Sequence, residues 1–418
     1  MRNVRENLMP STLRTALALA LGAAVSLGLA RFSYALLLPP MRADLGWSYL
    51  TSGAMNTVNA AGYLAGALLT VSWLKRHAAR RVFLWGSAIA GIALIAHGLV
   101  SDDAWLYLLR FITGVASAAT FIAGGLLAAR LASDASRADA SGDRESGRPA
   151  QAGLILGVYY GGTGIGIVAS ALLVPVLISS TALQHRAHDW QHAWFGLGIA
   201  ALLATIVMAA ATRHLDAQAS AATERSRFPV RGFAFGLAAY FLFGLGYIGY
   251  MTFVITLLRE LRLSSALITS FFVALGVAVI ASSWLWARLL QKSRGGEAMT
   301  LLDALLAVAT LLPVLSAHPI AVFASGLMFG GAFLSVVAST TALVRHNLEA
   351  SAWSAGISAF TIVFAAGQIV GPTLIGWVAD GSSGLRGGLL CSAAVLALAA
   401  IVAWLQKPLA RGRDVATQ

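Results

Sequence analysis

Apolar runs long enough to cross a lipid bilayer recur from one end of this 418-residue chain to the other. About 20 helical residues span the hydrocarbon core, and lipid offers no hydrogen bonds to an open backbone. We therefore expect an all-α integral membrane protein with twelve transmembrane helices. They are predicted at residues 15–38, 51–73, 82–100, 104–129, 153–177, 192–211, 232–257, 266–290, 299–317, 320–344, 352–378 and 387–405.

The composition leaves no room for a large aqueous domain, because 58% of the residues are apolar and only 11% are charged. The net charge of +12 does not indicate nucleic-acid binding, since the basic residues form short clusters between the apolar runs. Cys391 is the one cysteine, so neither a disulfide nor a cysteine-based metal site can form within one chain. We expect no cofactor. The first run is longer than a signal-peptide core and ends in Pro39 and Pro40, which favours a retained first helix.

Lys and Arg are unevenly distributed over the loops. One alternate set, which includes both termini, carries most of them, whereas the opposite set carries only Arg42, Arg186, Arg259, Arg262 and Arg386. Basic residues resist translocation, so the first set is predicted to face the cytoplasm. The sequence thus predicts a multi-pass protein of the bacterial inner membrane, in contact with lipid, with both termini cytoplasmic.

A polar segment after the sixth run divides the chain into two halves. We predict an N-terminal six-helix bundle at 1–212, a cytoplasmic linker at 213–231 and a C-terminal six-helix bundle at 232–418. The fifth and eleventh runs echo each other in glycine content. Such small residues let helix backbones approach closely or bend, and a moving bundle interface needs both properties. The candidate conformational glycines are Gly157, Gly161, Gly164 and Gly371; static helix packing is the alternative interpretation.

Several motifs resemble the major facilitator superfamily over essentially the whole chain. The fourth run carries Leu106, Arg110 and Gly114 at the superfamily spacing, and residues 28–41 and 59–66 are similar to its YbfB-type branch. The resemblance implies two pseudo-symmetric six-helix bundles, the major facilitator fold, and a monomeric secondary transporter that works by alternating access. Two features depart from the pattern. Gly162 stands where a proline is usual, and the loop that follows the second run contains no Asp or Glu.

Arg31 and Arg110 are predicted to lie inside the first and fourth helices. A charge at such depth costs about 2.5 to 3.5 kcal/mol and normally faces water, a partner or a ligand. Because no acid lies in the interior of the first six runs, we expect the two guanidinium groups to bind an anion from outside, such as a carboxylate. Alternatively, Arg110 is the superfamily's structural or coupling arginine, and Arg31 bonds backbone carbonyls.

Other polar side chains are predicted to line the same site. Tyr34 shares a helix face with Arg31, and Asn56, Asn59 and Tyr63 form a polar stripe along the second helix. From the C-terminal half, the predicted substrate-binding residues are Tyr247, Tyr250 and Gln368. Each tyrosine can equally serve in packing or as a gate.

Proton coupling requires a titratable group that water reaches from alternate sides. Asp303 is the only acid predicted inside a helix, and it is the candidate proton-coupling residue. The preferred interpretation of Asp303 is nevertheless a residue near a helix end that is bonded to a neighbour. His97 is expected to be wetted near an outer interface. If transport is proton-linked, Asp303 or the substrate's own carboxylate must carry the proton.

The leading hypothesis is a secondary transporter of a small organic anion, by proton symport or anion exchange. The alternative is a proton-coupled exporter of hydrophobic compounds or drugs. An enzyme is not expected, because no catalytic group sits at a plausible depth. His185, His188 and His192 are interpreted as part of a solvated loop and helix start rather than as a metal site.

Overall fold

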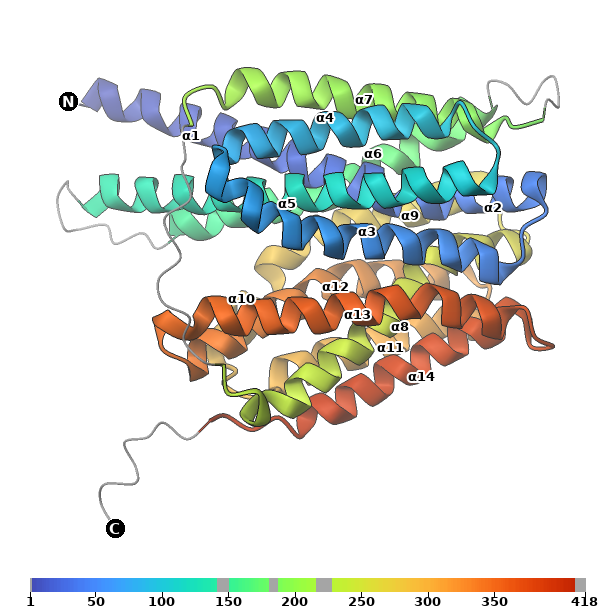
Figure 1. Cartoon of the computed structure of the whole chain (residues 1–418). Coiled ribbons are helices and arrows are strands. Elements are labelled where there is room, and N and C mark those ends of the chain that lie inside the picture. Colours follow the sequence, from blue (N-terminus) through green and yellow to red (C-terminus); the bar gives the residue numbers. More distant parts are fainter. Residues whose placement is uncertain (1, 141–149, 180–186, 216–227, 410–418) are drawn as a thin grey trace, which may run out of the picture. The chain divides into compact units, whose positions relative to one another are not determined.

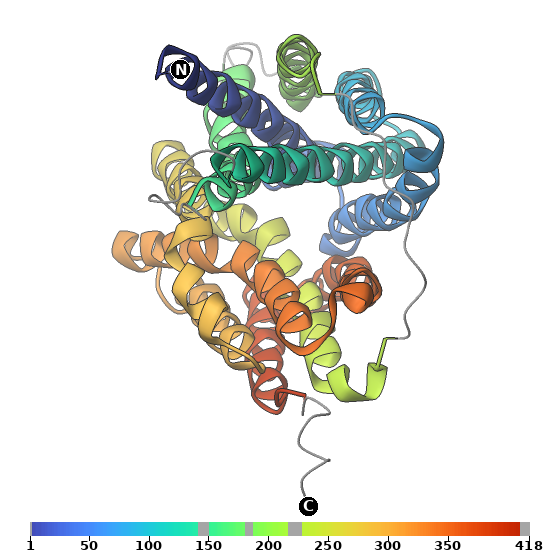
Figure 2. The same ribbon diagram turned by 90° about the vertical axis from the view of Figure 1, so that its left-hand side faces the viewer.

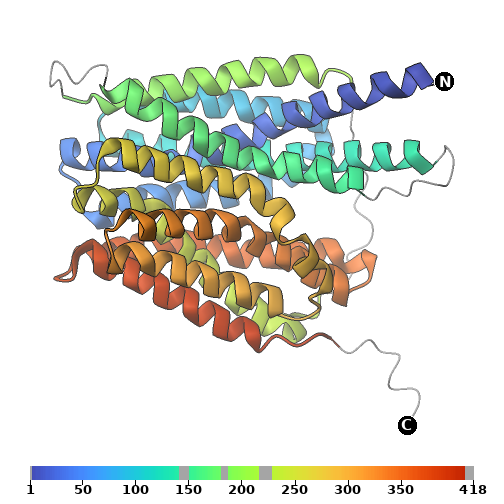
Figure 3. The same ribbon diagram turned by 180° about the vertical axis from the view of Figure 1, so that it is seen from behind.

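The computed structural model describes residues 2–140, 150–179, 187–215 and 228–409. Throughout these ranges the regular elements are helices (Figure 1, Figure 2 and Figure 3). They are α1 (Arg2–Ala23), η1 (Ala24–Phe32), α2 (Tyr34–Leu45), α3 (Tyr49–Arg76), α4 (Ala79–His97), α5 (Asp103–Ala140), α6 (Ala150–Ser179), α7 (Trp190–Ala211), η3 (Val230–Phe233), α8 (Ala234–Glu260), α9 (Ser265–Leu285), α10 (Ala287–Lys292), α11 (Glu297–Leu315), α12 (Pro319–Asn347), η4 (Ala350–Ala352), α13 (Trp353–Ala379) and α14 (Gly384–Trp404).

Twelve helical stretches within the described ranges are long and apolar enough to cross a membrane, which confirms the predicted all-α membrane fold. The first of them, Thr12–Leu45, joins α1, η1 and α2. The prediction that the first helix stops at Leu38 is wrong, because α2 continues through Pro39 and Pro40. It ends at Gly46, whose φ of 66° is a left-handed cap that a side chain would disfavour.

The middle of the first span is a wide π-helical turn, η1, in which every residue is buried. The amide of Ser33 donates to the carbonyl of Gly28, five residues earlier, at 3.0 Å. The Ser33 hydroxyl donates to the Leu29 carbonyl at 2.5 Å. Such turns are rare and occur often at functional sites. This one places Ala30 and Arg31 in its last turn.

The folded chain forms two compact units. The first comprises Met1–Gly46, Val58–Ser220 and Ser264–Ala281; the second comprises Trp47–Thr57, Ala221–Leu263 and Ser282–Gln418. Each half of the sequence thus places one short helical segment in the other unit. The repeat boundaries at 1–212 and 232–418 stay a prediction.

Glycines set the closest helix contacts in each unit. In the first unit α1 packs on α6 (Figure 3), and a Cβ on Gly162 would lie 2.0 Å from the Ala20 carbonyl oxygen. A Cβ on Gly164 would lie 2.3 Å from the Gly276 carbonyl oxygen. In the second unit α13 packs on α8, and a Cβ on Gly371 would lie 2.4 Å from the Leu245 carbonyl oxygen.

The glycine candidates therefore differ in their surroundings. At Gly161 the first neighbour of an added Cβ would be Ile280, at an ordinary 3.7 Å. Gly157 is buried. Gly164 and Gly371 occupy helix contacts that leave no space for a side chain, whereas Gly161 does not. A role for these four glycines in conformational change stays a prediction.

We predict that Gly164→Ala and Gly371→Ala each destabilise the fold by about 1 to 3 kcal/mol, because the added methyl group overlaps backbone atoms of the neighbouring helix. Gly161→Ala is the matched control and should be neutral or slightly stabilising, since alanine has the higher helix propensity. Thermal unfolding of the purified variants in detergent measures the difference. Equal destabilisation by all three substitutions would contradict this account.

Candidate functional site

The structure brings Arg31 and Arg110 together in the first unit. Both side chains are buried, with 3% and 1% of their surfaces exposed. Arg110 Nη1 donates to the carbonyl oxygen of Ala30 at 3.2 Å, and its guanidinium carbon lies 4.6 Å from the centre of the Tyr34 ring. Electrostatic repulsion acts between the two arginines. The wide turn of η1 thus supplies the carbonyl that compensates part of the Arg110 charge.

Arg31 is less well compensated than Arg110. Its guanidinium carbon lies 5.4 Å from the centre of the Tyr63 ring. Its Nε and Nη2 atoms are buried, and neither has a hydrogen-bond partner among the described residues. For these two nitrogens the alternative in which Arg31 bonds backbone carbonyls is not observed. Buried donors on a cation favour an incoming acceptor that carries negative charge.

Asn59 completes the group of predicted residues in the first unit. Its Nδ2 donates to the Arg110 carbonyl at 3.0 Å, and its Oδ1 is buried without a partner among the described residues. The close approach has a simple cause. A Cβ on Gly114 would lie 2.2 Å from the Asn59 carbonyl oxygen, so α3 and α5 meet backbone to backbone. Small residues thereby hold the polar groups of both helices together.

Asn56 does not join this group, although it shares the predicted polar stripe with Asn59. It belongs to the segment of α3 in the second unit, where its Nδ2 donates to Thr252 Oγ1 at 2.7 Å. The two asparagines of the stripe therefore bond different helices. Asn59 bonds the backbone of Arg110 in α5, and Asn56 bonds Thr252 and so fixes the start of α3 to α8.

The predicted residues of the C-terminal half form two separate arrangements in the second unit. Gln368 Nε2 donates to the Tyr247 hydroxyl, and both side chains are buried. The Tyr250 hydroxyl bonds Ser325 Oγ at 2.6 Å, and Ser325 in turn donates to the Ala309 carbonyl. The Tyr250 ring stacks on Phe329 with centroids 3.9 Å apart. These contacts support the packing interpretation of Tyr250, whereas Tyr247 and Gln368 form a polar pair.

Asp303 differs from its preferred sequence interpretation. It lies in the second turn of α11, its side chain is fully buried, and neither carboxylate oxygen has a hydrogen-bond partner among the described residues. The expectation of a helix-end residue bonded to a neighbour is therefore wrong. Asp303 is also the one buried acid in the described part of the chain. A negative charge on a carboxyl buried without partners is costly, so the neutral, protonated form of Asp303 is favoured.

His97 also differs from expectation, because it is fully buried rather than wetted. Its ring stacks on Trp194 with centroids 4.6 Å apart, and its Nδ1 bonds the Ala93 carbonyl at 2.7 Å, which makes Nδ1 the donor. Nε2 is buried and has no partner among the described residues. Burial first, and then the charge of Arg110, oppose a positive charge on His97.

Two glycines, Gly91 in α4 and Gly198 in α7, are the sequence feature that indicates why His97 is buried. A Cβ on Gly198 of α7 would lie 2.7 Å from the carbonyl oxygen of Gly91 of α4. The two glycines draw these helices together and enclose the ring. The position of His97 near a helix end does not by itself indicate which helix covers the ring.

The histidines near the start of α7 do not form a metal cluster among the described residues. His185 lies outside those residues. His188 Nδ1 lies 2.5 Å from Asp44 Oδ2, and Trp190 Nε1 donates to the same oxygen at 2.6 Å. These contacts tie the start of α7 to the end of α2.

The comparison with known families gives a direct result. A family model described as the uncharacterised MFS-type transporter YbfB matches residues 23–404. The chain belongs to this family. The resemblance seen in the sequence is thereby confirmed, and the fold and family are those of transporters. No curated protein matches the chain.

Solved structures share the fold at low sequence identity. A bacterial homologue of the human lysosomal transporter Spinster, inward-facing and unoccupied, has a TM-score of 0.67 at 14% identity, over 95% of this chain and 97% of that one. The nucleoside transporter NupG has 0.68 at 14% identity, over 95% and 100%. The human organic anion transporter MFSD10 (TETRAN) has 0.63 at 14% identity, over 94% and 99%. At this identity the likeness shows the fold alone.

We predict that replacing Arg110 and replacing Arg31 have different effects on the stability of the fold. Arg110→Met should destabilise the fold by about 1 to 3 kcal/mol, because it removes the bond to Ala30 and the packing on Tyr34. Arg31→Met should be neutral or stabilising without substrate, because it removes buried donors that lack partners. Thermal unfolding in the same detergent compares both variants with wild type. A larger loss of stability for Arg31→Met than for Arg110→Met would refute the assignment.

Proposed function

We propose that the protein is a secondary active transporter of small organic anions, with carboxylates as the substrate class, by proton symport or anion exchange. The proposal places it in the bacterial inner membrane as a monomer with both termini cytoplasmic. The observation that carries it is the pair of buried guanidinium groups at Arg31 and Arg110, of which Arg31 keeps two donors unpaired among the described residues.

The charge distribution supports an anionic substrate. No acid in the described part of the first unit is buried, so the two cations have no fixed carboxylate beside them. A carboxylate can accept two parallel hydrogen bonds from one guanidinium, and its charge would also relieve the repulsion between the arginines. The Asn59 amide bonds the Arg110 carbonyl, and the rings of Tyr63 and Tyr34 lie beside Arg31 and Arg110, respectively.

The proposal assigns Tyr247 and Gln368 to substrate contact from the C-terminal half during the alternating-access cycle. Tyr250 is assigned to the same half as a supporting residue, since its hydroxyl and ring are engaged with Ser325 and Phe329. The organic anion transporter among the solved structures is in keeping with this substrate class. The nucleoside transporter has a TM-score at least as high, so the proposal of an anionic substrate rests on the two arginines and not on the shared fold.

Proton coupling is assigned to Asp303 or to His97. Asp303 is a buried carboxyl in a place where its charge is costly. His97 offers a second route, because an anion bound at Arg110 would offset the repulsion that opposes a proton on Nε2. Anion and proton would then bind cooperatively: the bound anion would raise the affinity for the proton, and the bound proton would raise the affinity for the anion by the same factor.

Arg31→Ala should lower the initial rate of carboxylate transport at least tenfold, because the substitution removes the guanidinium donors that lack a partner among the described residues. A thermal-shift screen of small carboxylates on purified wild type selects the substrate, since a ligand stabilises the state it binds. Uptake of the labelled compound into liposomes measures the rate. Arg386→Ala, which removes an exposed arginine, is the control and should transport like wild type.

Retained anion transport in Arg31→Ala would overturn the role of Arg31. Broad protection of an efflux-deficient host against toxic hydrophobic compounds, without stabilisation by any carboxylate, would favour the alternative function, proton-coupled drug export.

Removal of the proton-coupling residue should abolish the response to a pH gradient but leave anion exchange. For a monocarboxylate moved with one proton, a difference of one pH unit supports about tenfold accumulation. Asp303→Asn and His97→Gln are each reconstituted and tested for uptake with and without the gradient. Gradient-driven accumulation in both variants would exclude both assignments, and no accumulation in wild type would leave exchange as the mechanism.

A further inference from the structure

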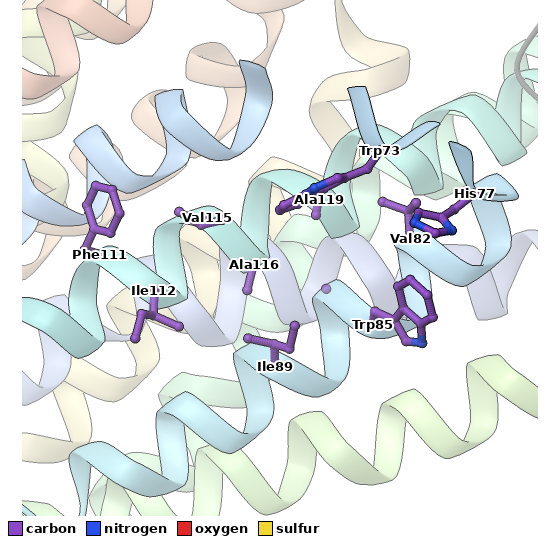
Figure 4. Close-up of a pocket in the computed structure, with 11 residues that line it drawn as sticks. Trp73, His77, Val82, Trp85, Ile89, Phe111, Ile112, Val115, Ala116 and Ala119 are labelled. Atoms are coloured by element: carbon purple, nitrogen blue, oxygen red, sulfur yellow. The ribbon is translucent and has the colours of Figure 1, made fainter. Parts of the chain in front are cut away.

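An apolar groove lies in the first unit between the end of α3 and the facing sides of α4 and α5 (Figure 4). Its volume is about 270 Å³. Gly86, Ala116 and Ala119 are its small lining residues. Gly86 lies where the backbones of α4 and α5 meet, because a Cβ on it would be 2.8 Å from the Ala116 carbonyl oxygen.

Several of the other lining residues are large and exposed. Trp85, Ile89 and Phe111 expose 52%, 48% and 37% of their surfaces, and all three belong to membrane-spanning helices. Surface exposed on such helices is expected to face lipid. The groove follows α5 from Phe111 to Ala119, about 12 Å at 1.5 Å per residue, which is close to the thickness of one leaflet of hydrocarbon.

One end of the groove lies beside the junction of α3 and α4, which carries the basic residues Lys75, Arg76, Arg80 and Arg81. His77 and Trp85 line the groove there, and their rings meet edge to face at 5.2 Å. Lys75, Arg76 and Arg81 are exposed within a few residues of His77, and no described carboxylate forms an ion pair with them.

The fourth cation of this junction, Arg80, has a different role. Its Nη2 donates to the Ala209 carbonyl at 2.8 Å and holds the start of α4 against the end of α7. The other three cations lie in the last turn of α3 and the first turn of α4, and no carboxylate among the described residues pairs with them.

We propose that this groove binds an anionic phospholipid, with an acyl chain between α4 and α5 and the phosphate held by Lys75, Arg76 and Arg81. The apolar lining suits a hydrocarbon chain, the tryptophans suit the interface, and the cations complement the headgroup charge. The proposal also explains the departure from the superfamily pattern, since a lipid phosphate supplies the negative charge that the loop lacks.

The test uses the purified full chain and native mass spectrometry, with phosphatidylglycerol or phosphatidylcholine added in detergent. We expect phosphatidylglycerol to be retained in preference to phosphatidylcholine. The triple variant Lys75→Gln, Arg76→Gln and Arg81→Gln should lose the preference, by about fivefold for each cation removed. Trp85→Ala should weaken retention of both lipids, because it opens the groove wall.

A matched control comes from the second unit, where Arg288, Lys292 and Arg294 are three exposed cations. Their triple substitution by Gln removes the same charge and should leave the preference intact. An equal loss in both triple variants would show a general charge effect and overturn the site. The same would follow if glycerol phosphate stabilised the protein as much as phosphatidylglycerol, since the acyl chain would then contribute nothing. Circular dichroism and thermal unfolding verify that each variant is folded.

Discussion

The need to compensate a cation away from water governs the arrangement of the first unit. Arg110 meets this need with the carbonyl of Ala30 and the face of the Tyr34 ring. The carbonyl is supplied by the last turn of η1, whose wide π-helical geometry differs from that of a regular helix. Arg31 follows in the same turn with two donors unpaired among the described residues. One stretch of backbone thus supplies an acceptor to one cation and holds a second cation whose Nε and Nη2 lack a partner among the described residues.

Close backbone contacts make this arrangement rigid. Gly28 meets Gly166, and Gly114 meets the Asn59 carbonyl, so η1, α3, α5 and α6 are held at separations that side chains would prevent. In a membrane such packing substitutes for the hydrophobic effect, because lipid is as apolar as the helix surface.

The two units differ in the kind of buried ionisable side chain that they hold. Among the described residues, the buried cations Arg31 and Arg110 belong to the first unit, and the buried acid Asp303 belongs to the second. His97 is a buried titratable group of the first unit, where its ring stacks on Trp194.

The sequence by itself determined the all-α membrane fold, the number of spans, the family and the presence of two deep arginines. Hydropathy and residue spacing are local properties, and the membrane forces each apolar run to be helical whatever its neighbours are. Only the tertiary structure decided the continuation of the first helix past Pro39, the π-helical turn, the burial of His97 against Trp194 and the isolation of Asp303. Each of these depends on which helix packs against which, because a polar group's burial and partners are set by residues far away in the chain.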